Sequence, residues 1–147
     1  MDPILVLGWL GIFSPVALGA IGSTLGCTIA GQAACGAMLD TETGHGRFVG
    51  LSALPSTQVV LGIVVMFTLN RSVTPENAPG IFAIGVLTGL ALLFSAWYQG
   101  KSVASAIYAA KNKPGILGLA VAPAAIVEGF SVFAFVFALV LSGSIPA

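Results

Sequence analysis

The sequence predicts an all-α membrane protein of four transmembrane helices, arranged as two tandem helical hairpins. Three observations carry this prediction. Hydrophobic residues make up 57% of the 147 and charged residues only 7%, and the mean hydropathy is +1.05, which is far from the composition of a water-soluble domain. Short charged segments separate long apolar ones. The 19 glycines favour close packing between membrane helices. One membrane domain is expected over residues 1–147, with a first hairpin over 1–75 and a second over 76–147.

A membrane-spanning helix is expected in each segment that lacks charged residues and is long enough to cross a bilayer, which takes about 20 residues. The first uncharged segment, 3–39, is too long for one span, and Pro15 is expected to separate a short interfacial lead from a helix over 16–38. The other three spans are expected over 48–70, within 78–110 and over 115–141. Each of the four is long enough to be a membrane-spanning helix.

The connectors at 40–47, 71–77 and 111–114 are short and rich in turn formers, so successive helices should be antiparallel neighbours. Arg47, Lys111 and Lys113 lie in the first and third connectors, and Arg71 lies in the second. The positive-inside rule therefore predicts that both termini are on the non-cytoplasmic side. The net charge of zero and the lack of a basic run give no reason to expect a nucleic-acid partner.

The two halves of the chain resemble each other, which indicates an internal duplication. GQAACGAML at 31–39 parallels GKSVASAIY at 100–108, and GRFVGLSALP at 46–55 parallels GILGLAVAP at 115–123. In each half a proline is followed by a polar residue, which is Gln58 after Pro55 in the first half and Glu128 after Pro123 in the second. Only the second hairpin therefore keeps a carboxylate inside the membrane.

Small residues recur every fourth position on the first and third predicted helices. Gly22, Gly26 and Ala30 follow this spacing, as do Gly85 and Gly89. A single motif of this kind is common in a pair of dimerising helices. Because it occurs in both halves, it favours an inner layer of small residues, as in a ring of several subunits.

Glu128 is the main candidate for a functional residue. An ionised carboxylate deep in a bilayer costs several kcal/mol, and Glu128 lies about halfway along the fourth predicted span. Binding of a proton or a metal cation would offset that cost. The alternative is a protonated glutamic acid that hydrogen-bonds to a neighbouring helix for structural reasons alone.

Other polar residues are expected at the depth of Glu128. Counted from the nearest connectors at 1.5 Å per residue, Gln58 and Gln99 lie at similar depth. Thr57 adds a hydroxyl, and Pro55 should disturb the preceding turn and leave main-chain carbonyls without helical donors. A cluster of neutral oxygens with one carboxylate suits a small monovalent cation better than a transition metal.

These residues carry a family resemblance that covers essentially the whole chain. LPSTQ at 54–58, Gln99, and Glu128 within AIVEGF resemble the proteolipid rotor-ring subunit of V-type and A-type rotary ATPases, in its duplicated four-helix form. The resemblance implies a non-catalytic subunit with no cofactor, which carries Na⁺, in preference to H⁺, across the membrane. It implies Na⁺ ligation by the residues that follow: the Leu54 carbonyl, the Thr57 hydroxyl, the Gln58 and Gln99 side-chain oxygens, and the Glu128 carboxylate.

The resemblance also implies the surroundings of the chain. Its partners would be identical copies in a ring, a membrane stator subunit that supplies an arginine, central-stalk subunits on the cytoplasmic side, and lipid. The expected location is a prokaryotic plasma membrane, which the chain crosses several times. The chain lacks the phosphate-binding GxxxxGK[ST] motif, so ATP chemistry is expected on other subunits.

Three positions, Leu61, Gln58 and Gln99, bear on the transported ion. Sodium-transporting members carry a tyrosine one turn after the glutamine, and here that position is Leu61. Proton-using relatives generally lack the surrounding polar set, so Gln58 and Gln99 favour Na⁺ over H⁺. Lys101, two positions after Gln99, is expected on the opposite side of its helix and therefore not as a partner of Glu128.

Two other functions remain open from the residues. A small proton-coupled exporter would also use a membrane glutamate, but it needs an aromatic substrate cavity, and neither tryptophan nor tyrosine occurs on the helix of Glu128. A four-span scaffold would use Glu128 only for packing. A large detergent-resistant ring would favour the rotor, a dimer the exporter, and a monomer or loose oligomer the scaffold.

Overall fold

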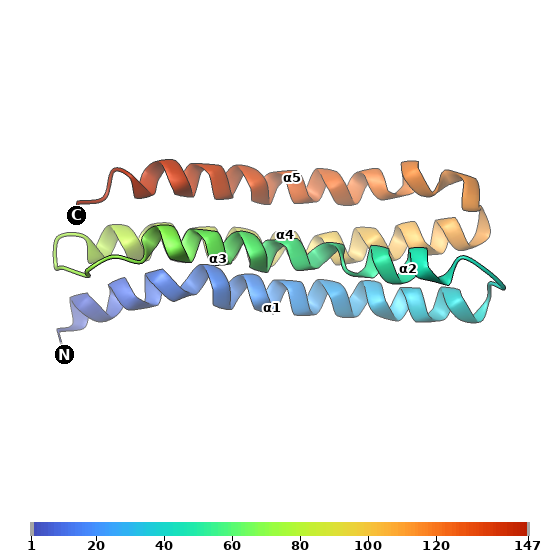
Figure 1. Cartoon of the computed structure of the whole chain (residues 1–147), viewed down its shortest axis with the longest axis horizontal. Coiled ribbons are helices and arrows are strands. Elements are labelled where there is room, and N and C mark those ends of the chain that lie inside the picture. The colour runs from blue at the N-terminus through green and yellow to red at the C-terminus, as the bar shows by residue number, and fades with distance from the viewer. Residues whose placement is uncertain (1, 147) are drawn as a thin grey trace.

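The computed structural model describes residues 2–146 and shows a bundle of long helices that run side by side (Figure 1). Within this range, four helical spans are long and apolar enough to cross a membrane. The elements in chain order are α1 (Pro3–Leu39), α2 (His45–Ser52), η1 (Leu54–Ser56), α3 (Thr57–Leu69), α4 (Ala78–Asn112), η2 (Pro114–Ile116) and α5 (Leu117–Ser142). The all-helical fold class predicted from composition is confirmed.

The helices alternate in direction, and both described chain ends lie at the same end of the bundle (Figure 1). α1 packs mainly against α4, α3 packs against α1, and α5 packs against α4. The pair formed by α1 and α4 is therefore the centre of the bundle. The hairpin packing that short connectors predicted is confirmed.

Glycine is required where α1 and α4 meet because the two backbones touch. A Cβ atom on Gly22 would lie 2.5 Å from the Leu93 carbonyl oxygen, a distance at which backbone must move. Gly85 lies against the carbonyl of Gly11, and Gly100 lies against the carbonyl of Gly26. The predicted ridges of small residues thus form the contact between the two central helices.

The break expected at Pro15 is wrong. α1 is continuous from Pro3 to Leu39 with Pro15 inside it. A proline removes one helical hydrogen bond, but in a membrane the helix is retained where neighbouring helices and hydroxyl side chains compensate for the loss. The carbonyl that Pro15 leaves without a helical donor is that of Gly11, and it lies against Gly85 of α4. Pro15 itself is buried, and its carbonyl faces Gly62 of α3.

Pro55, in contrast, interrupts the second span. α2 ends at Ser52, η1 covers Leu54–Ser56, and α3 begins at Thr57. The proline sits within the short 3₁₀ turn and is buried, so the sequence prediction that Pro55 disturbs the preceding turn is confirmed. Pro123 lies inside α5 without ending it, so the two matched prolines do not act alike.

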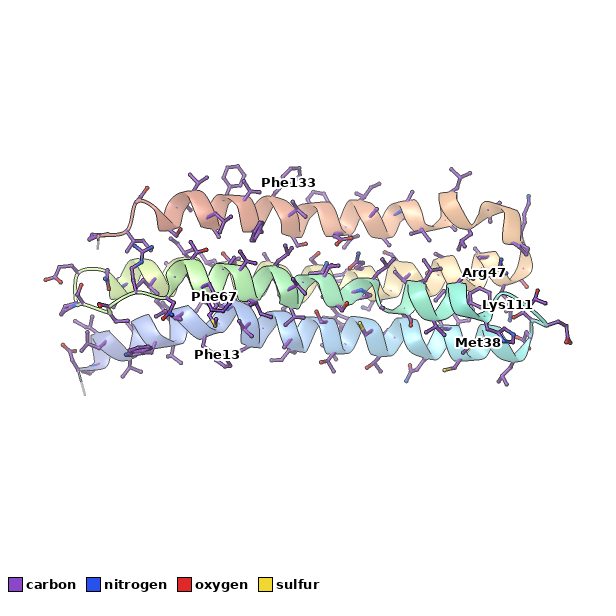
Figure 2. The ribbon with its side chains drawn as sticks, viewed as in Figure 1. Phe13, Met38, Arg47, Phe67, Lys111 and Phe133 are labelled. Atoms are coloured by element: carbon purple, nitrogen blue, oxygen red, sulfur yellow. The ribbon has the colours of Figure 1, made fainter. Side chains whose placement is uncertain are left out.

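Polar contacts tie the two ends of the bundle. Lys111 Nζ lies 2.6 Å from Asp40 Oδ2, which joins the first and third connectors at the end where Arg47 and Lys111 are labelled in Figure 2. At the other end Arg71 donates to the carbonyls of Thr68, Ser142 and Ile145, at 3.3, 3.0 and 3.2 Å. The basic connectors therefore share one end of the bundle, and Arg71 lies at the end that holds the termini.

Candidate ion-binding site

Three helices and one turn bring the predicted site residues together. Thr57 and Gln58 begin α3, Gln99 lies in α4, and Glu128 lies in α5. Their side chains form one connected set of hydrogen bonds. The Leu54 carbonyl, in η1, joins the set through the Thr57 hydroxyl at 3.2 Å. All five residues singled out from the sequence are therefore neighbours.

Glu128 accepts a hydrogen bond at each carboxylate oxygen. Thr57 Oγ1 lies 2.7 Å from Glu128 Oε1, and Gln99 Nε2 lies 3.0 Å from Glu128 Oε2. The side chain is half-buried. No counter-charge is involved in these contacts, so an ionised Glu128 would rely on neutral donors from α3 and α4.

The Thr57 hydroxyl lies close to three other oxygen atoms. Three acceptors lie within hydrogen-bond distance of Oγ1: Glu128 Oε1 at 2.7 Å, Gln58 Oε1 at 3.1 Å and the Leu54 carbonyl at 3.2 Å. A hydroxyl carries one proton, and the shortest contact, to the carboxylate, is the one that a charged acceptor favours. Four oxygens thus converge where a single proton is available, which is the arrangement that a small hard cation would stabilise.

The two glutamines link this group to the bundle interior. Gln58 and Gln99 are fully buried, and Gln58 Nε2 donates to Gln99 Oε1 at 3.0 Å. Because buried amides are costly without partners, this contact holds both side chains in place. The polar level predicted from the counted depths is therefore present, at the interface of α3 and α4.

Two serines of this region were not singled out from the sequence. Ser95, one turn before Gln99, lies 3.4 Å from Gln58 Nε2 and donates to the Val127 carbonyl at 3.1 Å. Ser23 of α1 accepts from the Val59 backbone N–H at 3.3 Å, which satisfies one of the donors left free where α3 begins. The spacing of four between Ser95 and Gln99 places both on one helix face and could have indicated Ser95.

Lys101 lies away from this site, as its position two residues after Gln99 predicted. Its side chain is exposed, whereas Gln99 is buried. Its ammonium lies 4.6 Å from the centre of the Trp97 ring and 4.8 Å from that of the Tyr98 ring. Cation–π contacts of this kind attract a lysine to aromatic faces, so Lys101 has partners of its own.

Comparison with known proteins adds an independent line of support. The family model that describes the C subunit of ATP synthase matches the chain twice, at residues 10–69 and 82–141. The A-type ATP synthase subunit K of Methanocaldococcus jannaschii is 28% identical over 141 residues, which cover 96% of this chain and 63% of that protein. The chain thus spans less than two thirds of that relative's length.

A second relative is similar over nearly its whole length. The V-type sodium ATPase subunit K of Enterococcus hirae is 28% identical over 141 residues, 93% of this chain and 90% of that protein. The two matches of one family model agree with the two hairpins of the fold and with the internal duplication. The chain belongs to the ATP synthase C-subunit family and holds two copies of its hairpin.

Proposed function

We propose that this chain is the membrane rotor subunit of a V-type or A-type ATPase, and that it carries Na⁺ through the site around Glu128. The ligands are the Leu54 carbonyl, the Thr57 hydroxyl, the Gln58 and Gln99 side-chain oxygens and the Glu128 carboxylate. The chain moves ions and does not catalyse ATP hydrolysis or synthesis. Membership of the ATP synthase C-subunit family supports the rotor role.

The observation that carries the proposal is the convergence of oxygens on the Thr57 hydroxyl. Leu54, Gln58 and Glu128 each bring an oxygen to within 3.2 Å of Thr57 Oγ1. Protonation of Glu128 would satisfy one of these contacts. A bound Na⁺ would be coordinated by several of them at once, and neutral oxygens with one carboxylate are the ligands that hard monovalent cations take.

The charge of the site connects ion binding to rotation. One Na⁺ on one carboxylate is electrically neutral, so the occupied site can face lipid at low cost. The bare carboxylate is costly there and is retained next to the stator. An arginine of the stator subunit pairs with Glu128 at that point and releases the ion. α5 is suited to a lipid-facing position because Phe130, Phe133 and Phe137 are exposed on it, and Phe133 points away from the bundle (Figure 2).

The partners follow from this mechanism. Identical copies form a ring, with α1 and α4 on the inside and the α2–α3 span and α5 on the outside. Central-stalk subunits bind the end formed by the first and third connectors, which carries Arg47, Lys111 and Lys113. By the positive-inside rule that end is cytoplasmic and the termini are outside, in a prokaryotic plasma membrane.

Na⁺ is preferred over H⁺ for two reasons. Gln58 and Gln99 are fully buried beside the carboxylate. Their amide oxygens can coordinate a metal ion, whereas a proton on Glu128 needs no such ligands. The relative from Enterococcus hirae is named a sodium ATPase subunit. Leu61, where a tyrosine would strengthen the site, is only partly buried, and the Thr57 hydroxyl is a hydrogen-bond donor to the carboxylate.

A hydrophobic carbodiimide tests the role of Glu128. Such a reagent partitions into lipid and reacts with a carboxylic acid in its protonated form, so Glu128 should be labelled selectively in the detergent-extracted assembly. Asp2, Asp40, Glu42 and Glu76 are exposed near the ends of the bundle and serve as internal controls in the same peptide map. Label found mainly on those four residues would contradict the rotor proposal.

A further inference from the structure

Ser95 is a buried serine whose hydroxyl is shared between two helices. It lies in α4, and its Oγ donates to the Val127 carbonyl of α5 at 3.1 Å. Val127 immediately precedes Glu128, so this bond connects α4 to the turn that carries the carboxylate. Because the hydroxyl proton is used in this way, the oxygen lone pairs of Ser95 remain available as acceptors.

One of those lone pairs faces the ion-binding site. Gln58 Nε2 lies 3.4 Å from Ser95 Oγ and 3.0 Å from Gln99 Oε1. The Gln58 amide nitrogen thus has two acceptors, of which the nearer belongs to a proposed Na⁺ ligand. Gln99 in turn directs its Nε2 at Glu128 Oε2, at 3.0 Å.

Binding of Na⁺ changes the hydrogen-bond partners that the Gln58 and Gln99 amides require. A cation next to Glu128 repels N–H groups and attracts carbonyl oxygens, so Gln99 must turn its Oε1 from Gln58 toward the ion. A turn of the amide exchanges oxygen and nitrogen at nearly the same positions. Gln58 Nε2 then loses its nearer acceptor, and a buried N–H without an acceptor is costly. Within residues 2–146, the remaining acceptor of Gln58 Nε2 is Ser95 Oγ.

We propose that Ser95 is a positioning residue for Na⁺ selectivity, which keeps an acceptor for the Gln58 amide hydrogen when the Gln99 oxygen turns to the ion. The inference rests on the proposed function of the Glu128 site. Protonation of Glu128 makes no such demand, since the contacts of Gln99 and Gln58 can stay as they are. Ser95 therefore favours Na⁺ binding and leaves proton binding nearly unaffected.

The test uses carbodiimide labelling of Glu128 in the detergent-extracted full-length assembly. Na⁺ slows labelling because it occupies the carboxylate, and the half-protective Na⁺ concentration is measured in wild type and in Ser95→Ala. Ser95→Ala removes the bond to the Val127 carbonyl whether or not Na⁺ is bound, so the difference comes from the lost acceptor of Gln58 Nε2. Loss of that one buried hydrogen bond predicts about a tenfold increase in the half-protective concentration. Labelling without Na⁺, followed over a pH series, should be unchanged. A general structural defect would alter both quantities.

Three further variants keep the test decisive. Ser95→Thr retains the hydroxyl, and Ser95 lines an open groove between α4 and α5 that offers room for the methyl group, so near-wild-type protection is expected. Ser142→Ala is the matched control, because Ser142 is also buried and its hydroxyl bonds only within α5. If Ser95→Ala does not assemble, Ser95→Cys replaces the hydroxyl by a weak acceptor of similar shape and should show the same increase.

The outcomes separate the inference from the proposed function. Wild-type protein that Na⁺ does not protect would overturn the sodium assignment and the role of Ser95 with it. Wild-type protein that is protected, with Ser95→Ala protected at the same Na⁺ concentration, would overturn the role of Ser95 alone. The same conclusion would follow if Ser95→Thr lost protection as fully as Ser95→Ala.

Discussion

Gly22→Ala should destabilise the bundle by forcing apart its two central helices. A Cβ atom at this position would lie 2.5 Å from the Leu93 carbonyl oxygen and 2.6 Å from the Leu93 Cα. Real Cβ contacts are essentially never shorter than 3.0 Å, so α1 and α4 must separate by about 0.5 Å or more along this contact. Both contacted atoms are backbone and cannot rotate away.

The expected cost is that of overpacking, about 1–3 kcal/mol, and it should appear as a lower Tm of the detergent-extracted protein by several degrees. Gly118→Ala is the control, because nothing lies within 4 Å of the Cβ it would add. Equal Tm values for the two variants would refute the reasoning that backbone contact between α1 and α4 holds the bundle together.

Two further predictions concern the site and one end of the bundle. Thr57→Val removes the hydroxyl contact to Glu128 at 2.7 Å at nearly constant volume, so Na⁺ affinity measured by ²²Na⁺ binding should fall about tenfold while the assembly remains intact. Unchanged affinity would remove Thr57 from the ligand set. Arg71→Ala removes donors to three carbonyls and should cost about 1.5–3 kcal/mol in thermal unfolding. Lys111→Ala breaks an ion pair with the exposed Asp40 and should cost less than about 1 kcal/mol of stability. A larger loss of stability in Lys111→Ala than in Arg71→Ala would contradict this prediction.

The sequence was sufficient to predict four spans, though not where the first begins, and the grouping of the site residues. Charge spacing located the four spans because hydrocarbon excludes charged residues over a fixed thickness. Residues at one depth on adjacent helices can meet when they also face each other. For this reason Gln58, Gln99 and Glu128, which are far apart in the chain, were correctly expected to be neighbours.

The effects of Pro15 and Pro123, and the contacts that Ser95 makes with α3 and α5, could not be read from the sequence. Pro15, Pro55 and Pro123 carry the same ring, yet only Pro55 interrupts a helix. The outcome depends on which neighbouring groups compensate for the lost hydrogen bond, and that is a property of packing. The spacing from Gln99 places Ser95 on the same helix face, but its bonds to Gln58 and Val127 depend on how α3 and α5 pack against α4.

Competition between Na⁺ and H⁺ for Glu128 tests the central claim most directly. Carbodiimide labelling of Glu128 needs the protonated acid, whereas Na⁺ binding needs the ionised form, so the two ligands exclude each other at one carboxylate. We predict that added Na⁺ slows labelling at fixed pH, and that less Na⁺ is needed as the pH rises because fewer protons compete. K⁺ at equal ionic strength serves as the control and should have little effect. A labelling rate that depends on pH but is unchanged by Na⁺ across the series would contradict the sodium site and leave a rotor that carries protons.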